Sequence, residues 1–210
     1  MKKHLLTLNL LCFVTFLQAQ TSIVQSLSFD SEVFTSTRQK LNNLDAEPFE
    51  KLIYETNGLK LPYRLLSPKK LKTGVKYPLV IAIHNSSRLG DDNEKQLEPL
   101  TRTWLKDEIR TKFPAFVLAP QFETRPTKYA ANDIFGAVTA TPQQNLQALL
   151  SLIESLTKNP QIDTERIYLI GYSMGGSVVQ HLLSFQPDRF AAAISVAGVP
   201  DVSNLQNIKR

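Results

Sequence analysis

The chain has 210 residues, of which 42% are hydrophobic, and a formal net charge of +5. This length and apolar content exclude a wholly disordered chain and predict one domain with a sizeable core, since two domains that each have their own core would need more residues. The basic excess is mild and spread along the sequence, without a dense basic run interleaved with aromatic residues, so we expect no nucleic-acid partner.

Residues 1–19 have the three parts of a secretory signal. Lys2 and Lys3 form a basic start, residues 5–17 form an apolar stretch, and Ala19 precedes polar residues. Polar residues interrupt the stretch, and it is shorter than the roughly 20 apolar residues of a spanning helix, so we expect signal cleavage and no stable membrane insertion. The predicted localisation is therefore secreted or periplasmic.

The residues before the domain, which comprise the signal and the segment that follows it, contain few groups that could take part in catalysis. Cys12, the only cysteine, lies inside the signal, so the mature chain is expected to have no disulfide, thiol nucleophile or thiolate metal ligand. Residues 20–48 show no convincing periodicity and are interpreted as a leader, with helical tendency over residues 31–44. The domain itself is expected to cover residues 49–210.

An antiparallel hairpin is predicted to open the domain. Residues 49–55 and 59–66 have the pattern of strands, and Asn57-Gly58 between them tolerates the positive φ of a tight primed turn. Two short and almost wholly apolar runs follow, at residues 77–84 and 114–119. Such runs are typical of strands that are buried on both faces of a parallel sheet.

Helices and strands are predicted to alternate along the rest of the chain. We expect a helix around residues 94–109 and a second helix that begins at the capping-box sequence Thr141-Pro142-Gln143-Gln144. The apolar face of the second helix is marked by Leu146, Leu149, Leu150, Ile153 and Leu156. A strand at 166–171, a helix at 174–185 and a strand at 191–197 complete the pattern. This alternation predicts an α/β domain with an open, mostly parallel sheet.

Residues 171–175 have the sequence Gly-Tyr-Ser-Met-Gly, which is a G-x-S-x-G pattern between a predicted strand and a predicted helix. A turn this sharp strains the serine backbone, and glycine at Gly171 and Gly175 removes the clash that side chains would cause there. The following helix directs its first amides, including that of Met174, toward the place where a tetrahedral oxyanion would form. We interpret Ser173 as a nucleophile, in preference to an incidental serine in a glycine-rich turn.

The sequence around this motif resembles the α/β-hydrolase superfamily. Residues 166–176 and 187–193 are similar to secreted esterases of the polyhydroxybutyrate-depolymerase and feruloyl-esterase type and to prolyl-oligopeptidase-like predicted peptidases. Shorter motifs upstream match the same group in the same order: LPYRL at 61–65, YPLV at 77–80, GDDN at 90–93 and APQ at 119–121. The resemblance covers residues 49–197. It implies the α/β-hydrolase fold, a mostly parallel sheet opened by an antiparallel hairpin.

One loop departs from the pattern of these proteins. Where they usually have His-Gly followed by small residues, this chain has His84-Asn85-Ser86-Ser87. The resemblance implies that this loop supplies the second oxyanion amide, from Ser86 by position, while Met174 supplies the first. Asparagine tolerates positive φ well, and we expect the loop to keep its shape in that way.

Other polar residues are assigned structural roles. The resemblance gives His84 a structural role rather than that of a base. His181 lies eight residues after Ser173, about 12 Å along the predicted helix, so we expect a surface or packing residue that cannot reach the serine. Asp91 and Asp92 are interpreted as helix caps rather than calcium ligands, because no full metal-loop spacing follows. We expect no metal and no organic cofactor.

The resemblance implies acyl transfer through Ser173 and an acyl-enzyme. We expect a secreted serine hydrolase of carboxylic esters, with simple or polymer-linked substrates. One alternative is a serine peptidase of the prolyl-oligopeptidase-like type, which would act on peptides. Another alternative is a non-catalytic hydrolase-like protein that binds carbohydrate or a partner.

The triad acid and histidine of α/β-hydrolases follow strands that come after the type of strand predicted at 191–197. We therefore expect both residues, and the C-terminal strands that carry them, beyond Arg210, since Asp201 stands too early and no histidine follows His181. A serine without a base is a poor nucleophile, so we expect the 210-residue chain alone to be a poor hydrolase. The missing strands would also leave a sheet edge exposed.

Overall fold

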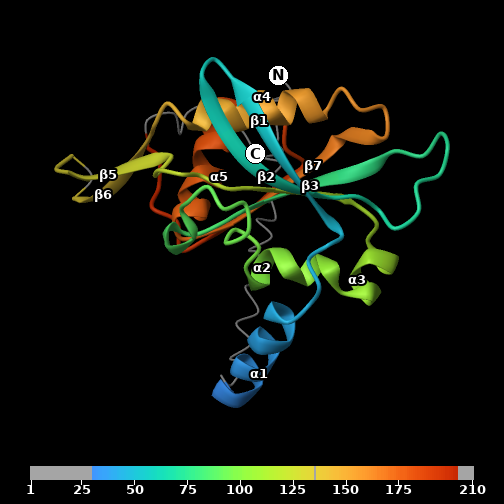
Figure 1. Ribbon diagram of the computed structural model, residues 1–210. Helices are drawn as coiled ribbons and strands as arrows, with labels where there is room; N and C mark the ends of the chain where they lie inside the picture. The colour runs from blue at the N-terminus through green and yellow to red at the C-terminus, as the bar shows by residue number, and fades with distance from the viewer. Residues whose placement is uncertain (1–29, 135, 203–210) are drawn as a thin grey trace, which may run out of the picture.

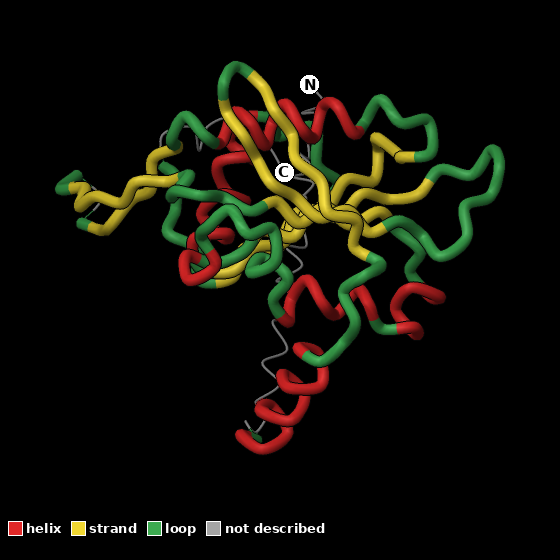
Figure 2. Tube along the Cα trace, viewed as in Figure 1, coloured by secondary structure: helices red, strands yellow, loops and turns green. Residues whose placement is uncertain are grey.

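A computed structural model describes residues 30–134 and 136–202. The expected secretory signal, including Cys12, lies outside the described residues. Figures 1 and 2 show a central twisted sheet with helices on both of its faces. No helix in the described part of the chain is long and apolar enough to cross a membrane.

The central sheet has six strands in the order β1-β2-β4-β3-β7-β8. Strands β4, β3, β7 and β8 run parallel, and β1 and β2 join them as antiparallel strands. This arrangement is the predicted mostly parallel sheet opened by an antiparallel hairpin. The strand bounds are Phe49–Thr56 for β1, Leu59–Leu66 for β2, Tyr77–Ile83 for β3, Phe116–Pro120 for β4, Ile162–Tyr172 for β7 and Ala192–Val196 for β8.

The hairpin that opens the sheet is confirmed together with its turn. Asn57 has a φ of 49° and Gly58 a φ of 74°, so both turn residues adopt the left-handed conformation expected of a primed turn. Strand β3 is buried along almost its whole length between β4 and β7, as its apolar sequence predicted. Strand β8 pairs with β7 alone among the described strands, and it exposes Ile194 and Val196.

Two helices cover one face of the sheet and shorter ones cover the other (Figure 1). Helix α4 (Leu146–Leu156) and helix α5 (Met174–Phe185) contribute to the larger apolar core. The smaller core lies beside α2 (Pro99–Arg102), a short 3-10 turn at Thr103–Leu105, and α3 (Asp107–Lys112). Of the predicted apolar face of α4, three side chains are fully buried, namely Leu146, Leu149 and Ile153.

The continuous helix predicted around residues 94–109 is wrong. Pro99 has no amide hydrogen and disfavours helical geometry in the residue before it, and Glu98 accordingly has a φ of −85° and a ψ of 172°. Lys106, with a ψ of 130°, interrupts the helical path again. The segment is therefore divided into α2, the 3-10 turn and α3.

The capping box predicted at residues 141–144 is also wrong. Thr141 and Pro142 belong to strand β6 (Ala137–Pro142), which pairs with β5 (Thr127–Asn132) in a hairpin that the sequence pattern did not predict. The Thr141 hydroxyl donates to the Lys128 carbonyl across this hairpin, at 3.4 Å. Helix α4 begins only at Leu146, because strand pairing overrides the local capping preference.

Helix α1 (Ser31–Asn42) fulfils the helical tendency of the leader segment. Asp30 caps the helix by accepting hydrogen bonds from the Glu32 and Val33 amides at 2.9 and 3.0 Å. None of its residues is buried, and it projects from the body of the domain next to α2 (Figure 1).

Candidate active site

Ser173 lies in a strained turn between β7 and α5. Its φ of 55° and ψ of −115° lie outside the regions that L-residues prefer, which confirms the conformation expected of the turn. The Ser173 amide donates to the Val196 carbonyl at 2.8 Å, so the end of β8 supports the turn. The residue remains partly exposed at the carboxyl end of the parallel strands.

Both glycines of the motif are required by close backbone contacts. A Cβ atom on Gly171 would lie 2.2 Å from the Gly175 carbonyl oxygen. A Cβ atom on Gly175 would lie 2.1 Å from the Ile83 carbonyl oxygen and 2.9 Å from that of His84. The start of α5 therefore packs directly on the end of β3, which brings the Met174 amide close to the loop that follows His84.

This loop keeps its shape through side-chain hydrogen bonds rather than through a positive φ. Asn85 has a φ of −79°, so the expectation of a left-handed asparagine is wrong. The Asn85 side-chain oxygen accepts hydrogen bonds from the Ser87 amide at 2.8 Å and the Ser87 hydroxyl at 2.7 Å, and its backbone carbonyl accepts the Arg88 amide at 3.1 Å. The side chain of Asn85 thus closes the turn locally.

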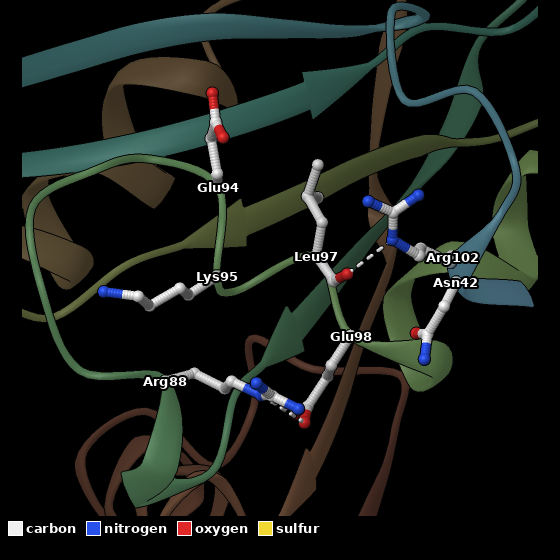
Figure 3. Close-up of a pocket in the computed structure, with 7 residues that line it drawn as sticks. All are labelled: Asn42, Arg88, Glu94, Lys95, Leu97, Glu98 and Arg102. Atoms are coloured by element: carbon white, nitrogen blue, oxygen red, sulfur yellow. Dashed lines mark hydrogen bonds and ion pairs between the residues drawn. The ribbon is translucent and has the colours of Figure 1, made fainter. Parts of the chain in front are cut away.

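Glu98 holds the same asparagine from the other side. Its carboxylate accepts hydrogen bonds from the Asn85 amide at 3.3 Å and from the Asn85 side-chain nitrogen at 2.6 Å. Figure 3 shows the Arg88 side chain turned toward Glu98, and the Arg88 Nε atom lies 3.7 Å from the Glu98 carboxylate. Burial raises the pKa of Glu98, while the Asn85 amide and Arg88 oppose that rise.

Hydrogen bonds within the protein occupy all but one of the backbone amides of residues 85–88. The Asn85, Ser87 and Arg88 amides all donate within the protein. Among the described residues we find no acceptor for the Ser86 amide. Helix α5 likewise provides no intrahelical acceptor for the Met174 amide, because the first amides of any helix are unpaired. The Ser86 and Met174 amides therefore have no acceptor among the described residues.

His84 has the structural role that was expected of it. Its Nε2 atom accepts a hydrogen bond from the Phe122 amide at 3.0 Å, so the proton resides on Nδ1 and is donated to the Asn85 carbonyl at 2.7 Å. Burial lowers the pKa of His84 to about 4, which keeps the ring neutral near pH 7. Both ring nitrogens are engaged, so His84 is not free to act as a base.

His181 is buried, so of the two expected roles, surface or packing, the structure shows packing. Its Nδ1 atom lies 2.8 Å from the Asp201 carboxylate and its Nε2 atom lies 2.9 Å from the Thr127 hydroxyl. Sequence reasoning missed this pairing, because the partners come from the β5–β6 hairpin and from the chain after β8. Neither histidine in the described part of the chain is free to deprotonate Ser173.

Asp92 closes a local turn rather than capping a helix, because no helix begins between Asp91 and Glu98, so the expectation of helix caps is wrong. Its carboxylate accepts hydrogen bonds from the Glu94 and Lys95 amides, both at 2.9 Å, and pairs with the Lys95 ammonium at 2.7 Å. The described residues contain no group of three or more His, Cys, Asp or Glu side chains that could hold a metal ion.

Comparison with known proteins gives both esterase and peptidase relatives. The model of the prolyl oligopeptidase family matches residues 138–209. The structure of a thermostable esterase is 31% identical with a TM-score of 0.68, and the match covers 78% of this chain and 44% of that one. A ferulic acid esterase from Anaeromyces mucronatus is 17% identical with a TM-score of 0.50, over 72% of this chain and 59% of that one.

A putative dipeptidyl aminopeptidase IV from Bacteroides ovatus is 19% identical with a TM-score of 0.51, and the match covers 72% of this chain and 21% of that one. No curated protein matches the sequence. This chain thus spans less than two thirds of the length of each solved structure described. The sheet and these likenesses define an α/β-hydrolase fold. The chain has this fold and resembles esterases and prolyl-oligopeptidase-like peptidases.

Proposed function

We propose that this protein is a secreted serine hydrolase that cleaves carboxylic esters through an acyl-enzyme on Ser173. The strained conformation of Ser173 between β7 and α5 is the observation that carries the proposal. A module that only binds a partner would have no use for such strain, whereas an exposed nucleophile requires it. Export of the protein is proposed from the signal-like residues 1–19 alone.

In the proposed mechanism, the Ser173 hydroxyl attacks the carbonyl carbon of the ester. The negative charge that develops on the carbonyl oxygen is stabilised by the Met174 and Ser86 amides. The alcohol leaves, and water then releases the acyl group from Ser173. Because His84 and His181 are both engaged, we propose that the base and its acid partner come from outside the described residues.

An ester is favoured over a peptide by the relative with the higher identity. The thermostable esterase is 31% identical to this chain, while the putative peptidase is 19% identical. The match to the prolyl oligopeptidase family model supports peptide hydrolysis as the second candidate.

A substrate panel tests the proposal directly. We expect the natural protein to hydrolyse acetyl, butyryl or feruloyl esters and to leave prolyl peptides uncleaved. A fluorophosphonate probe should label the protein, and mass spectrometry should locate the adduct on Ser173. Cleavage of the peptides without cleavage of any ester would reverse the order of the two candidates. A folded natural protein that the probe does not label would contradict the enzyme proposal.

Substitution of Glu98 tests whether the loop after β3 contributes an oxyanion amide. Glu98→Ala removes both hydrogen bonds that hold Asn85, so the Ser86 amide should lose its position. We expect kcat for ester hydrolysis to fall by about 100-fold, with little change in KM, because a misplaced donor acts on the transition state. Kinetics with a butyryl ester measure this split.

The control variant is Glu94→Ala, at an exposed glutamate of the same segment whose carboxylate pairs with Lys51 at 3.2 Å. This change should leave kcat within about twofold of the wild-type value, since exposed ion pairs contribute little. Equal kcat values for the Glu98 and Glu94 variants would show that Glu98 is not needed to hold the oxyanion loop in position.

A further inference from the structure

Two short motifs that the proposed mechanism does not use are in contact with each other in the structure. They are the sequence GDDN at residues 90–93 and the sequence APQ at residues 119–121, at the end of β4. The Gln121 side-chain oxygen accepts a hydrogen bond from the Asn93 amide, and the two residues are 0% and 2% exposed. Because buried amide groups are stable only when their hydrogen bonds are made, the contacts of these two residues fix their positions.

Gln121 connects the central sheet to the loop that follows β3. Its side-chain nitrogen donates to the Arg88 carbonyl at 3.3 Å and to the Asp92 carboxylate at 3.1 Å. Its backbone amide donates to the Pro62 carbonyl of β2 at 2.8 Å, so the glutamine itself is fixed to the sheet. The Arg88 carbonyl, which lies two residues after Ser86 in the chain, is therefore held in place by a residue of the sheet.

Phe122, the next residue, binds the same loop at two further points. Its amide donates to the His84 Nε2 atom at 3.0 Å, and its carbonyl accepts the Gly90 amide at 3.0 Å. His84 precedes residues 85–88 and Gly90 follows them. The two residues after β4 thus hold the loop on both sides of the proposed oxyanion amide.

Asn93 orients the Gln121 side chain and is itself bound to the β1–β2 hairpin. Its side-chain nitrogen donates to the Leu52 carbonyl at 2.8 Å and to the Tyr63 carbonyl at 3.2 Å. Its side-chain oxygen accepts a hydrogen bond from the Gln96 side chain. Asn93 has a φ of 56°, a conformation that asparagine adopts more readily than most residues, and this conformation directs its amide at Gln121.

We propose that Gln121 is a positioning residue for ester hydrolysis, which holds the Ser86 amide in place through its hydrogen bond to the Arg88 carbonyl. The inference rests on the proposed function, because it takes the Ser86 amide to be an oxyanion donor. Such a donor must be in position before charge develops on the substrate, and a displacement of about 1 Å can lower the rate about 100-fold. Gln121 therefore acts on kcat through the loop and not by contact with the substrate.

The substitution Gln121→Met in the natural protein tests this role, because methionine is of similar length but cannot make the three hydrogen bonds of the glutamine side chain. We expect kcat for a butyryl ester to fall at least about tenfold, with KM within about twofold of the wild-type value. Gln96→Met is the matched control. Gln96 is 0% exposed and donates to the Asn93 side chain, but among the described residues it has no hydrogen bond to residues 84–90. The control should keep kcat within about twofold of wild type.

The substitution Gln121→Glu adds a readout that packing alone would not change. Burial and the Asp92 carboxylate, whose charge Lys95 partly balances, should raise the pKa of the introduced carboxyl. The neutral acid can still donate a hydrogen bond, whereas the ionised form repels the Arg88 carbonyl. The ratio of the variant kcat to the wild-type kcat should therefore fall at least about tenfold from about pH 5.5 to about pH 8.5. This variant keeps the inference testable if Gln121→Met does not fold, and thermal melts at each pH verify folding.

The inference and the proposed function can fail separately. If a fluorophosphonate labels Ser173 but folded Gln121→Met keeps the wild-type kcat, the hydrolase proposal stands and the positioning role is wrong. Equal losses of kcat in the Gln121→Met and Gln96→Met variants, or a wild-type kcat for Gln121→Glu at the higher pH, would also overturn the inference. If the probe does not label Ser173 in the folded natural protein, the proposed function is wrong.

Discussion

Replacement of Ser173 by alanine should lower kcat/KM for ester hydrolysis by roughly 10⁴-fold or more in the natural protein. Ser173→Ala removes the proposed nucleophile, and only substrate binding and the oxyanion amides would then contribute to the rate. The thermal stability should remain close to the wild-type value, because alanine adopts the positive φ of this position with the same difficulty as serine. Hydrolysis assays and thermal melts measure the two quantities.

Ser184→Ala is a matched control for this substitution. Ser184 is buried on α5, the helix that Ser173 precedes, and its hydroxyl has no hydrogen-bond partner among the described residues. We expect this variant to retain full activity. Substantial turnover by purified Ser173→Ala protein would show that another residue carries the acyl group.

Replacement of Gly175 by alanine should lower the free energy of unfolding by more than about 3 kcal/mol and abolish hydrolysis. The added Cβ atom would lie 2.1 Å from the Ile83 carbonyl oxygen and 2.9 Å from that of His84. Both oxygens belong to backbone in or beside the central strand β3, so neither can move aside as a flexible side chain would. Urea unfolding curves measure the loss of stability.

Gly74→Ala separates this clash from the general cost of replacing a glycine. Gly74 has a φ of 75°, but no atom lies within 4 Å of the position that its Cβ would occupy. We expect this variant to lose about 1 kcal/mol, from backbone strain alone. Similar losses of unfolding free energy for the two variants would show that the close approach of α5 to β3 is not what requires glycine at position 175.

The sequence alone determined the parts of the fold that obey local rules. Asn57-Gly58 predicted the opening turn, because few other residue pairs accept a positive φ at both positions. The pattern from Gly171 to Gly175 predicted the start of α5 at Met174 and the strained Ser173, since the flanking glycines have a purpose only in a sharp turn. In each case the backbone conformation follows from the residues within that segment.

The tertiary structure alone decided the features that depend on distant partners. Thr141 and Pro142 have the local pattern of a helix start, but pairing of β6 with β5 places them in a strand. No local pattern joins His181 to Asp201, because their contact requires the chain after β8 to pass beside α5.

The same reason applies to the loop beside the candidate nucleophile. Asn85 was expected to shape this loop through its own backbone, and instead the carboxylate of Glu98, thirteen residues away, fixes it by two hydrogen bonds. Local preferences at Asn85 are worth at most about 1 kcal/mol, whereas a partly buried carboxylate that accepts two hydrogen bonds contributes more. Only the folded chain brings that carboxylate to the asparagine.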